Sequence, residues 1–310
     1  MTLLDEVICC PVCRNAQPVR EDGAYACPSC KRRFPVVRGI PRLLEDVPED
    51  SEQIQRVFDF EHRRFRDSWY TRFEPRLVDQ FLDDCRLPRE FFDGKRALDA
   101  GCGSGRWSYA LSELGTELVA FDLTEGGIEA AAEQLSGRPN VSVCQANLFQ
   151  PPLASESFDF VMSWGVLHHT PDTHRAFRQL VPLVKPGGTF YVMVYERHSP
   201  AMFFFTDLLR RFMRRLSDEQ RYKACRYLVI RSPTVARLVA PFLMISRYTP
   251  GSGLDVQTLQ FGLYDAYSPR YNHLHTRDEV RGWFDDAGFV DVEVFDTPTG
   301  SVKARGRRSE

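Results

Sequence analysis

Three features are missing from this sequence, and each absence removes a class of protein. No apolar run approaches the roughly 20 residues that a membrane-spanning helix needs, so we expect no transmembrane segment. Charge of one sign is not in excess, because 40 Lys and Arg are balanced by 42 Asp and Glu. That balance argues against indiscriminate binding to nucleic acid. The N-terminus lacks the basic start and apolar core of a secretory signal, and we therefore expect a cytoplasmic protein.

Four of the nine cysteines form two closely spaced pairs near the N-terminus. Cys10 and Cys13 make the first pair, Cys27 and Cys30 make the second, and 13 residues separate them. Two such C-x2-C turns bring four thiolates around one ion, which is the ligand set of structural zinc. A disulfide framework is the alternative, but nothing else in the sequence supports the oxidising compartment it needs. A catalytic zinc is not expected, because four thiolates leave no open coordination position.

The most informative stretch is the glycine-rich loop Gly101-Cys-Gly-Ser-Gly105. It follows a short apolar run that contains Asp99, and a helix-like stretch comes after it. A second apolar run then ends at Asp122. This order predicts a strand–helix–strand unit that binds a nucleoside at its top. Glycines let a ligand approach the backbone closely, and an acid after the second strand can accept hydrogen bonds from ribose hydroxyls.

The spacing of the glycines decides which nucleoside cofactor we expect. Dinucleotide-binding loops have the pattern G-x-G-x-x-G, whereas the glycines here stand at 101, 103 and 105. Asp99 would repel a pyrophosphate but attract a cation. S-adenosylmethionine carries a sulfonium and an ammonium and no phosphate, so the pattern favours this methyl donor over NAD. A structural turn in another α/β fold is the alternative, and the two acids argue against it.

Two further motifs follow the loop. A V-L-H-H-x-x-D stretch begins at Val166, after an expected strand at 158–163, and a K-P-G-G turn ends at Gly188, before an expected strand at 189–195. With these motifs, residues 95–196 resemble the class I S-adenosylmethionine-dependent methyltransferases. The resemblance implies an α/β fold with a Rossmann-like seven-stranded sheet, and it leaves the methyl acceptor open.

The same resemblance implies the cofactor contacts. Asp122 matches the ribose-binding acid, and Ser163 and Trp164 match a segment beside the methionine part and the acceptor. Asn147 stands where the family usually has an Asp that accepts a hydrogen bond from the adenine amino group. An amide oxygen can accept the same bond without charge, so we expect weaker recognition there. The implied set is Asp99, Gly101, Cys102, Gly103, Asp122, Leu123, Asn147, Leu148, Ser163 and Trp164.

The segment after the second cysteine pair carries another resemblance. Residues 34–44 read F-P-V-V-R-G-I-P-R-L-L. This pattern is similar to the end of the small zinc-ribbon activator proteins that partner many methyltransferases. The resemblance covers about residues 7–45 and implies that such a module is fused to the catalytic domain.

At 310 residues the chain can bury one core and carry additions. A capping box at Thr276–Glu279 is expected to open the last helix, before a closing hairpin and a frayed tail from Arg305. We expect five parts: a zinc-ribbon module at 1–46, a helical cofactor-covering segment at 47–93, the cofactor-binding core at 94–196, a helical insertion or lid at 197–275, and the C-terminal part of the core at 276–310.

The insertion is where we expect acceptor choice to lie. Between Arg197 and Arg247 it carries eleven Arg and Lys against three Asp and Glu, interleaved with large apolar side chains. Three uses stay open: a lid with solvated arginines, a peripheral membrane contact through 197–247, and a surface that follows RNA phosphates. The apolar richness fits RNA least, and an oligomer interface is a further use.

Candidate acceptor-site residues come from two stretches. His168 and His169 follow the fourth strand and could act as a base, which is needed only if the acceptor loses a proton. Residues 264–275 are dense in aromatic and histidine side chains, as a ligand-binding wall would be, although a polar turn would look the same. The expected acceptor contacts in that stretch are Tyr267, Tyr271, His273 and His275.

The leading hypothesis is a small-molecule methyltransferase with a built-in zinc ribbon. An rRNA or tRNA methyltransferase is the first alternative, because bacterial rRNA guanine methyltransferases also begin with a four-ligand zinc module. Those enzymes usually place a His where this chain has Cys30. The N/D-P-P-Y/F motif of base-amine methyltransferases is also missing, since the chain has Ser163-Trp-Gly-Val there. A non-catalytic S-adenosylmethionine-binding partner protein is the second alternative.

Overall fold

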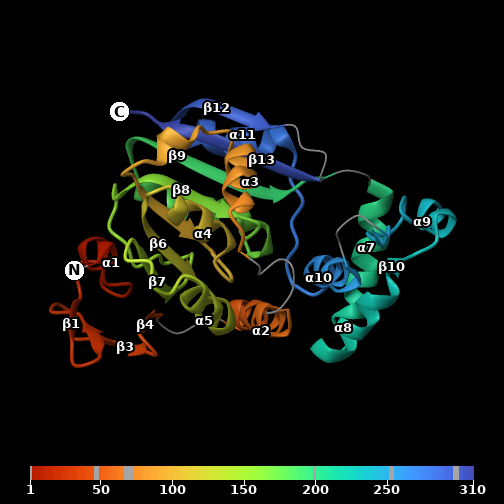
Figure 1. Cartoon of the computed structure of the whole chain (residues 1–310), viewed down its shortest axis with the longest axis horizontal. Coiled ribbons are helices and arrows are strands. Elements are labelled where there is room, and N and C mark those ends of the chain that lie inside the picture. The colour runs from red at the N-terminus through yellow and green to blue at the C-terminus, as the bar shows by residue number, and fades with distance from the viewer. Residues whose placement is uncertain (1, 45–48, 66–72, 198–199, 251–254, 296–299) are drawn as a thin grey trace.

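The computed structural model describes residues 2–44, 49–65, 73–197, 200–250, 255–295 and 300–310. A mixed sheet of eleven strands runs through the molecule in the order β1-β2-β3-β4-β7-β6-β5-β8-β9-β13-β12 (Figure 1). The last seven strands in this order form the core: β7 to β9 are parallel, and β13 is antiparallel to both β9 and β12. This is the expected Rossmann-like methyltransferase sheet. The core strands are β5 Arg96–Ala100, β6 Glu117–Asp122, β7 Val141–Ala146, β8 Phe158–Trp164, β9 Val184–Tyr195, β12 Phe289–Phe295 and β13 Ser301–Arg308.

Helices cover both faces of this sheet because its central strands are apolar on both sides. On β8, Phe160 and Met162 pack in one cluster with α3 and α4, whereas Val161 packs in another with α6 and α11. Tyr191 and Phe190 on β9 divide in the same way. The covering helices are α3 Arg76–Cys85, α4 Arg106–Glu113, α5 Glu125–Gln134, α6 Thr173–Leu180 and α11 Arg277–Asp286, with 3-10 turns η2 Arg89–Phe92, η3 Leu167–His169 and η4 Val181–Leu183.

The N-terminal residues share this sheet with the core. Strand β4 pairs in parallel with β7, placing Leu43 opposite Ala146. Cys10 and Cys27 are buried in the same apolar cluster as Val119 of β6. The elements here are α1 Leu3–Val7, β1 Val19–Glu21, β2 Ala24–Ala26, β3 Arg33–Val37 and β4 Ile40–Leu43.

A group of helices extends from beside α5 to the end of the molecule opposite β1 and β3 (Figure 1). It has an apolar core of its own, in which Val57 of α2 packs with Met213, Leu263 and Tyr264. Within the part of the chain that the structure describes, no helix combines the length and the apolar character needed to cross a membrane. The elements are α2 Glu49–Arg64, α7 Pro200–Met213, α8 Asp218–Tyr227, β10 Val229–Ile230, α9 Pro233–Val239, β11 Ser246–Arg247 and α10 Val256–Tyr267.

The C-terminus confirms one expectation and corrects another. The Thr276–Glu279 capping box is formed, with both reciprocal hydrogen bonds. The tail is not frayed at Arg305, because β13 continues to Arg308 between β9 and β12. Ion pairs from Arg305 to Glu293 and from Arg307 to Asp291 explain why such a basic segment can extend a strand.

Candidate active site

The carboxyl ends of β5, β6, β7 and β8 open onto a cavity of about 530 Å³. Parallel α/β sheets bind ligands at this edge, and the volume is within the usual range for small-molecule sites. Two helices from other parts of the chain complete the walls. Phe58, Glu61 and His62 come from α2, and Phe261 and Asp265 come from α10.

The glycine-rich loop forms the part of the cavity next to β5. Gly101 has φ +86°, and a Cβ there would lie 2.5 Å from a methyl group of Val166. Only glycine therefore allows the loop after β5 to meet the segment after β8. The N–H of Gly103 donates to Asp122 Oδ2 at 2.9 Å, which ties the loop to the end of β6.

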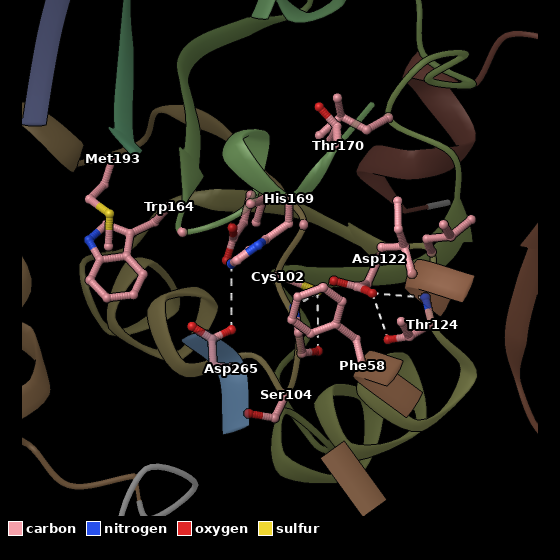
Figure 2. Close-up of a pocket in the computed structure, with 18 of the residues that line it drawn as sticks. Phe58, Cys102, Ser104, Asp122, Thr124, Trp164, His169, Thr170, Met193 and Asp265 are labelled. Atoms are coloured by element: carbon pink, nitrogen blue, oxygen red, sulfur yellow. Dashed lines mark hydrogen bonds and ion pairs between the residues drawn. The ribbon is translucent and has the colours of Figure 1, made fainter. Parts of the chain in front are cut away.

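Two carboxylates of different character face the cavity. Asp99 is buried, accepts a 2.6 Å hydrogen bond from Ser108 Oγ, and has its pKa raised to about 7 by that burial. Asp122 accepts hydrogen bonds at Oδ1 from the N–H and hydroxyl of Thr124, at 2.8 and 2.7 Å (Figure 2). A cation bound beside Asp99 would favour its ionised form. The buried carboxylate and the open glycine loop thus fit the methionine end of S-adenosylmethionine.

Most of the other expected cofactor contacts also line the cavity: Cys102, Leu123, Asn147, Leu148 and Trp164. The Oδ1 atom of Asn147 accepts from the N–H of Phe149 at 2.9 Å, so it caps its own turn. Trp164 Nε1 donates to Asp84 at 2.8 Å, which fixes the indole against one wall.

Ser163 does not line the cavity. Its buried hydroxyl donates to the carbonyl of Ala100 at 2.8 Å and holds the end of β8 to the end of β5. It therefore supports the loop from behind.

His169 and Asp265 point toward each other at the cavity wall (Figure 2). The two groups are joined by a 3.5 Å contact between His169 Nε2 and Asp265 Oδ1. His169 Nδ1 lies 3.1 Å from the carbonyl oxygen of Tyr271. A carbonyl only accepts, so we assign the proton of the neutral ring to Nδ1, which leaves a lone pair on Nε2. Burial lowers the pKa of His169, and the hydroxyl of Tyr195 donates to Asp265.

His168, the other expected base, does not line the cavity. Its ring packs on Tyr195 with centroids 4.0 Å apart, and neither ring nitrogen has a hydrogen-bond partner among the described residues. Burial holds its pKa well below the usual value. The two histidines are adjacent on the short turn η3, which directs them to different surroundings, so we retain only His169 as a candidate base.

The four expected acceptor contacts in 264–275 do not line the cavity either. Tyr267 is buried and donates to the carbonyl of Met244 at 2.7 Å. The N–H groups of His273 and His275 donate to the carbonyls of His168 and Tyr195, both at 2.9 Å. Tyr271 contributes its carbonyl to His169. The stretch therefore supports the site through its backbone, while Asp265 is its contribution to the wall.

Several lining residues were not identified from the sequence, notably Glu61, His62 and Asp265. The expected role of 47–93 as a cofactor cover follows from the resemblance to related enzymes, and no motif singles out an acid or a histidine within that segment. Asp265 lies in the aromatic stretch, where it is surrounded by more conspicuous residues. Their shared location depends on the packing of α2 against α10, which a sequence pattern does not display.

The four paired cysteines come together, and none of them lines the cavity. All their Sγ atoms lie within 4.8 Å of one another. Cys10 and Cys30 approach to 3.7 Å, and Cys13 and Cys27 to 3.6 Å. A tetrahedron with Zn–S bonds of about 2.3 Å has edges of about 3.8 Å. The arrangement therefore fits one tetrahedral metal ion.

Comparison with known proteins matches part of the chain to a family model. The methyltransferase domain model matches residues 98–192. The demethylmenaquinone methyltransferase of Geobacillus kaustophilus is 29% identical over 206 residues, covering 65% of this chain and 73% of that protein. The demethylmenaquinone methyltransferase of Staphylococcus aureus is 28% identical over 171 residues, covering 53% and 68%. Among solved structures, that of a DhpI–SAH complex is similar in fold, with a TM-score of 0.52 and 16% identity over 85% of this chain and 99% of that one.

The matched domain begins on β5 and ends on β9, so it spans the glycine loop, both acids and the segment that carries His169. A methyltransferase domain is thus matched over the same strands that form the cavity. Proteins that are similar over more than half of this chain carry methyltransferase names. The matched domain and the names of these relatives support an S-adenosylmethionine-dependent methyltransferase.

Proposed function

We propose that the enzyme methylates a small, largely apolar molecule that carries an acidic hydroxyl or an amine. The observation that carries this proposal is the pairing of His169 Nε2 with Asp265 in the wall of the cavity that holds the glycine loop. Aromatic side chains from α2, β8 and α10 make much of the remaining wall: Phe58, Trp164 and Phe261. The demethylmenaquinone methyltransferases similar to this chain, named for a small-molecule acceptor, support the same class.

The residues at the β5 and β6 ends are proposed to hold the cofactor. Asp122 would accept hydrogen bonds from the ribose, Asp99 would face the cationic methionine end, and Asn147 with Leu148 would border the adenine. When bound, S-adenosylmethionine supplies a methyl group already activated on a sulfonium. The protein therefore has to align the acceptor, exclude water and handle a proton.

His169 is proposed to take that proton. The neutral ring offers the Nε2 lone pair to an O–H or N–H of the acceptor. The proton would stay on Nε2, and the nearby carboxylate of Asp265 would stabilise the positive charge of the ring. The hydroxyl of Tyr195 fixes the position of Asp265. The Tyr271 carbonyl holds the opposite edge of the ring throughout.

Glu61 provides a second polar group in this region. Its Oε2 atom is buried and has no hydrogen-bond partner among the described residues. Burial, with a further contribution from Asp265, raises the pKa of Glu61 well above its usual value. A protonated carboxyl there can donate to a carbonyl or hydroxyl of the acceptor, which supports an oxygen-bearing molecule.

Labelled methyl transfer tests the proposal. Short-chain demethylmenaquinol and simple phenols are the probes, and mixed tRNA and rRNA are the comparison. We expect transfer to a small molecule, with kcat lowered by about 10²–10⁴ in His169→Gln and the affinity for S-adenosylmethionine unchanged. His174→Gln, on the outer helix α6, is the matched control and should keep full activity. Transfer to RNA alone, or full activity in His169→Gln, would contradict the proposal.

RNA methylation has one observation in its favour, the basic insertion. However, the exposed side chains of that insertion are aromatic and aliphatic as well as basic, and RNA phosphates would contact only the basic ones. RNA recognition also requires room for a splayed base, whereas α2 and α10 both line the cavity. We therefore favour the small molecule.

We also propose that Cys10, Cys13, Cys27 and Cys30 hold one structural zinc in a ribbon-type module. The four sulfur atoms have the spacing that a tetrahedral ion requires, and thiolates are the ligands that zinc prefers in closed sites. The resemblance of residues 7–45 to activator ribbons supports the same assignment.

A further inference from the structure

Helix α7 buries an arginine and exposes several large apolar side chains. The side chains of Thr206, Arg210 and Met213 are buried. Arg210 donates from its guanidinium to the carbonyls of Ala266 and Pro269, at 2.9 and 2.7 Å. The opposite face carries the larger apolar side chains, with exposed fractions of 64% for Phe204, 57% for Leu208 and 56% for Phe212. These three residues are four positions apart, so they form one stripe along the helix.

The apolar surface continues onto the segment after α7. The ring of Phe205 contacts that of Phe242 edge-on, with centroids 5.5 Å apart. Helix α9 buries only Ala236 and leaves Leu238 69% exposed. Of the eleven large apolar side chains that are exposed in the described chain, eight lie between 204 and 242. Such a concentration marks an interaction surface.

The charges of the same segment are strongly one-sided. Residues 197–247 carry eleven Arg and Lys against three Asp and Glu, although the whole chain has 40 against 42. Arg211 stands on the exposed face of α7 beside Phe212, and Arg237 lies on α9 beside Leu238. Exposed apolar side chains flanked by arginines are the composition of a helix that lies in the plane of an anionic bilayer surface.

We propose that α7 and α9 dock this enzyme on an anionic lipid surface. A second copy of the chain fits less well, because a two-fold contact would set the same arginine-rich surface against itself. RNA would be attracted by the arginines but would leave Phe204, Leu208 and Phe212 without an apolar environment. A lipid surface satisfies both, since headgroups meet the arginines and the acyl boundary takes the apolar stripe.

The docking face is also connected to the active site. Arg210 joins the buried side of α7 to the C-terminal end of α10, and Asp265 on α10 lines the cavity. The helix that carries the docking face thus packs against the helix that carries part of the cavity wall. The docking proposal itself does not depend on which acceptor is used.

Vesicle binding of the full chain tests the proposal. The probes are phosphatidylcholine vesicles with and without about one third phosphatidylserine, and binding is measured by cosedimentation at low and high salt. We expect binding to anionic vesicles to be at least about tenfold stronger than to neutral ones, and to weaken in salt. The triple variant Phe204→Ser, Leu208→Ser, Phe212→Ser and the triple variant Arg211→Glu, Arg215→Glu, Arg237→Glu should each lose about tenfold or more.

Matched controls separate this effect from general damage. Val290→Ser removes an exposed apolar residue on β12, and Arg20→Glu, Arg89→Glu, Arg178→Glu reverse three exposed charges elsewhere. Both should bind vesicles like the unchanged protein, and all variants should keep the affinity for S-adenosylhomocysteine. Equal binding to neutral vesicles, unchanged binding in both triple variants, or dimers that dissociate in the serine variant without any vesicle binding would overturn the proposal.

Discussion

Asp99 shows how one buried side chain can link cofactor binding to pH. Its pKa is about 7, raised mainly by burial, against 3.8 in an unfolded chain. The folded protein therefore holds this proton more tightly than the unfolded one. Its contribution to stability is present below about pH 4 and is lost as the pH rises toward 7. A cation bound beside Asp99 would lower its pKa, because the positive charge favours the carboxylate over the protonated acid.

We therefore predict that the affinity for S-adenosylmethionine rises between pH 5.5 and pH 8. At pH 8, Asp99→Asn should weaken binding by about 1.5–3 kcal/mol, the usual value for a hydrogen bond to a charged group, and the loss should be small at pH 5.5. Calorimetry in buffers of different ionisation enthalpy would detect the proton released on binding. An Asp99→Asn variant with the same pH slope as the unchanged protein would show that another group is responsible.

At the scale of elements, local sequence signals determine where some helices and strands begin and end, and tertiary contacts determine others. The turn before α11 is fixed locally: Thr276 Oγ1 accepts from the N–H of Glu279 at 3.2 Å, and Glu279 accepts from the N–H of Thr276 at 2.8 Å. In β13, by contrast, the arginines are held in a strand by partners on β12 and by β9. The capping box can be recognised within four residues of sequence, whereas the strand at β13 depends on partners distant in sequence.

Thr276→Ala should lower the free energy of unfolding by about 1 kcal/mol, because an N-cap hydrogen bond is lost and α11 packs directly on the sheet. Chemical denaturation would measure the change. Thr276→Ser, which keeps the hydroxyl, is the matched control and should unfold like the unchanged protein. Since neither Thr276 nor Glu279 lines the cavity, cofactor affinity should stay constant in both variants. A loss of affinity in Thr276→Ala would indicate that α11 is coupled to the site.

At the scale of the whole molecule, the cysteine cluster and the cofactor site lie on one continuous sheet. Strand β4 follows the cluster and pairs with β7, and Asn147 comes directly after β7. A metal that fixes the first 44 residues would therefore also support one wall of the cavity. This contact joins the N-terminal strands to the sheet that carries the cavity.

We predict one equivalent of zinc per chain in protein never exposed to chelator. Cys27→Ser should lose the metal, increase hydrogen exchange along β7 and weaken cofactor binding several-fold, because metal binding and folding are coupled. Cys9→Ser is the control, since its Sγ atom lies outside the four-sulfur cluster. Metal analysis with less than about a tenth of an equivalent would contradict the zinc assignment. Unchanged exchange along β7 would contradict only the link to the sheet.

The sequence by itself determined the features that depend on short spacings. The glycine loop with Asp99 and Asp122 predicts a nucleoside site because turn geometry and strand ends are local properties. The two cysteine pairs predict a closed metal site for the same reason, and the strand pattern of 94–196 predicts the sheet. Each of these signals lies within a few dozen residues.

Only the tertiary structure decided which side chains meet. Glu61 and Asp265 are about 200 residues apart in sequence and come together because α2 and α10 pack in one apolar cluster. Adjacent histidines on η3 received different environments, His169 at the cavity and His168 in the interior. Helix α7 buries Arg210, which donates to the carbonyls of Ala266 and Pro269, and exposes Phe204 on its other side. The surroundings of each of these side chains depend on which elements pack against it, and a local sequence pattern does not indicate those elements.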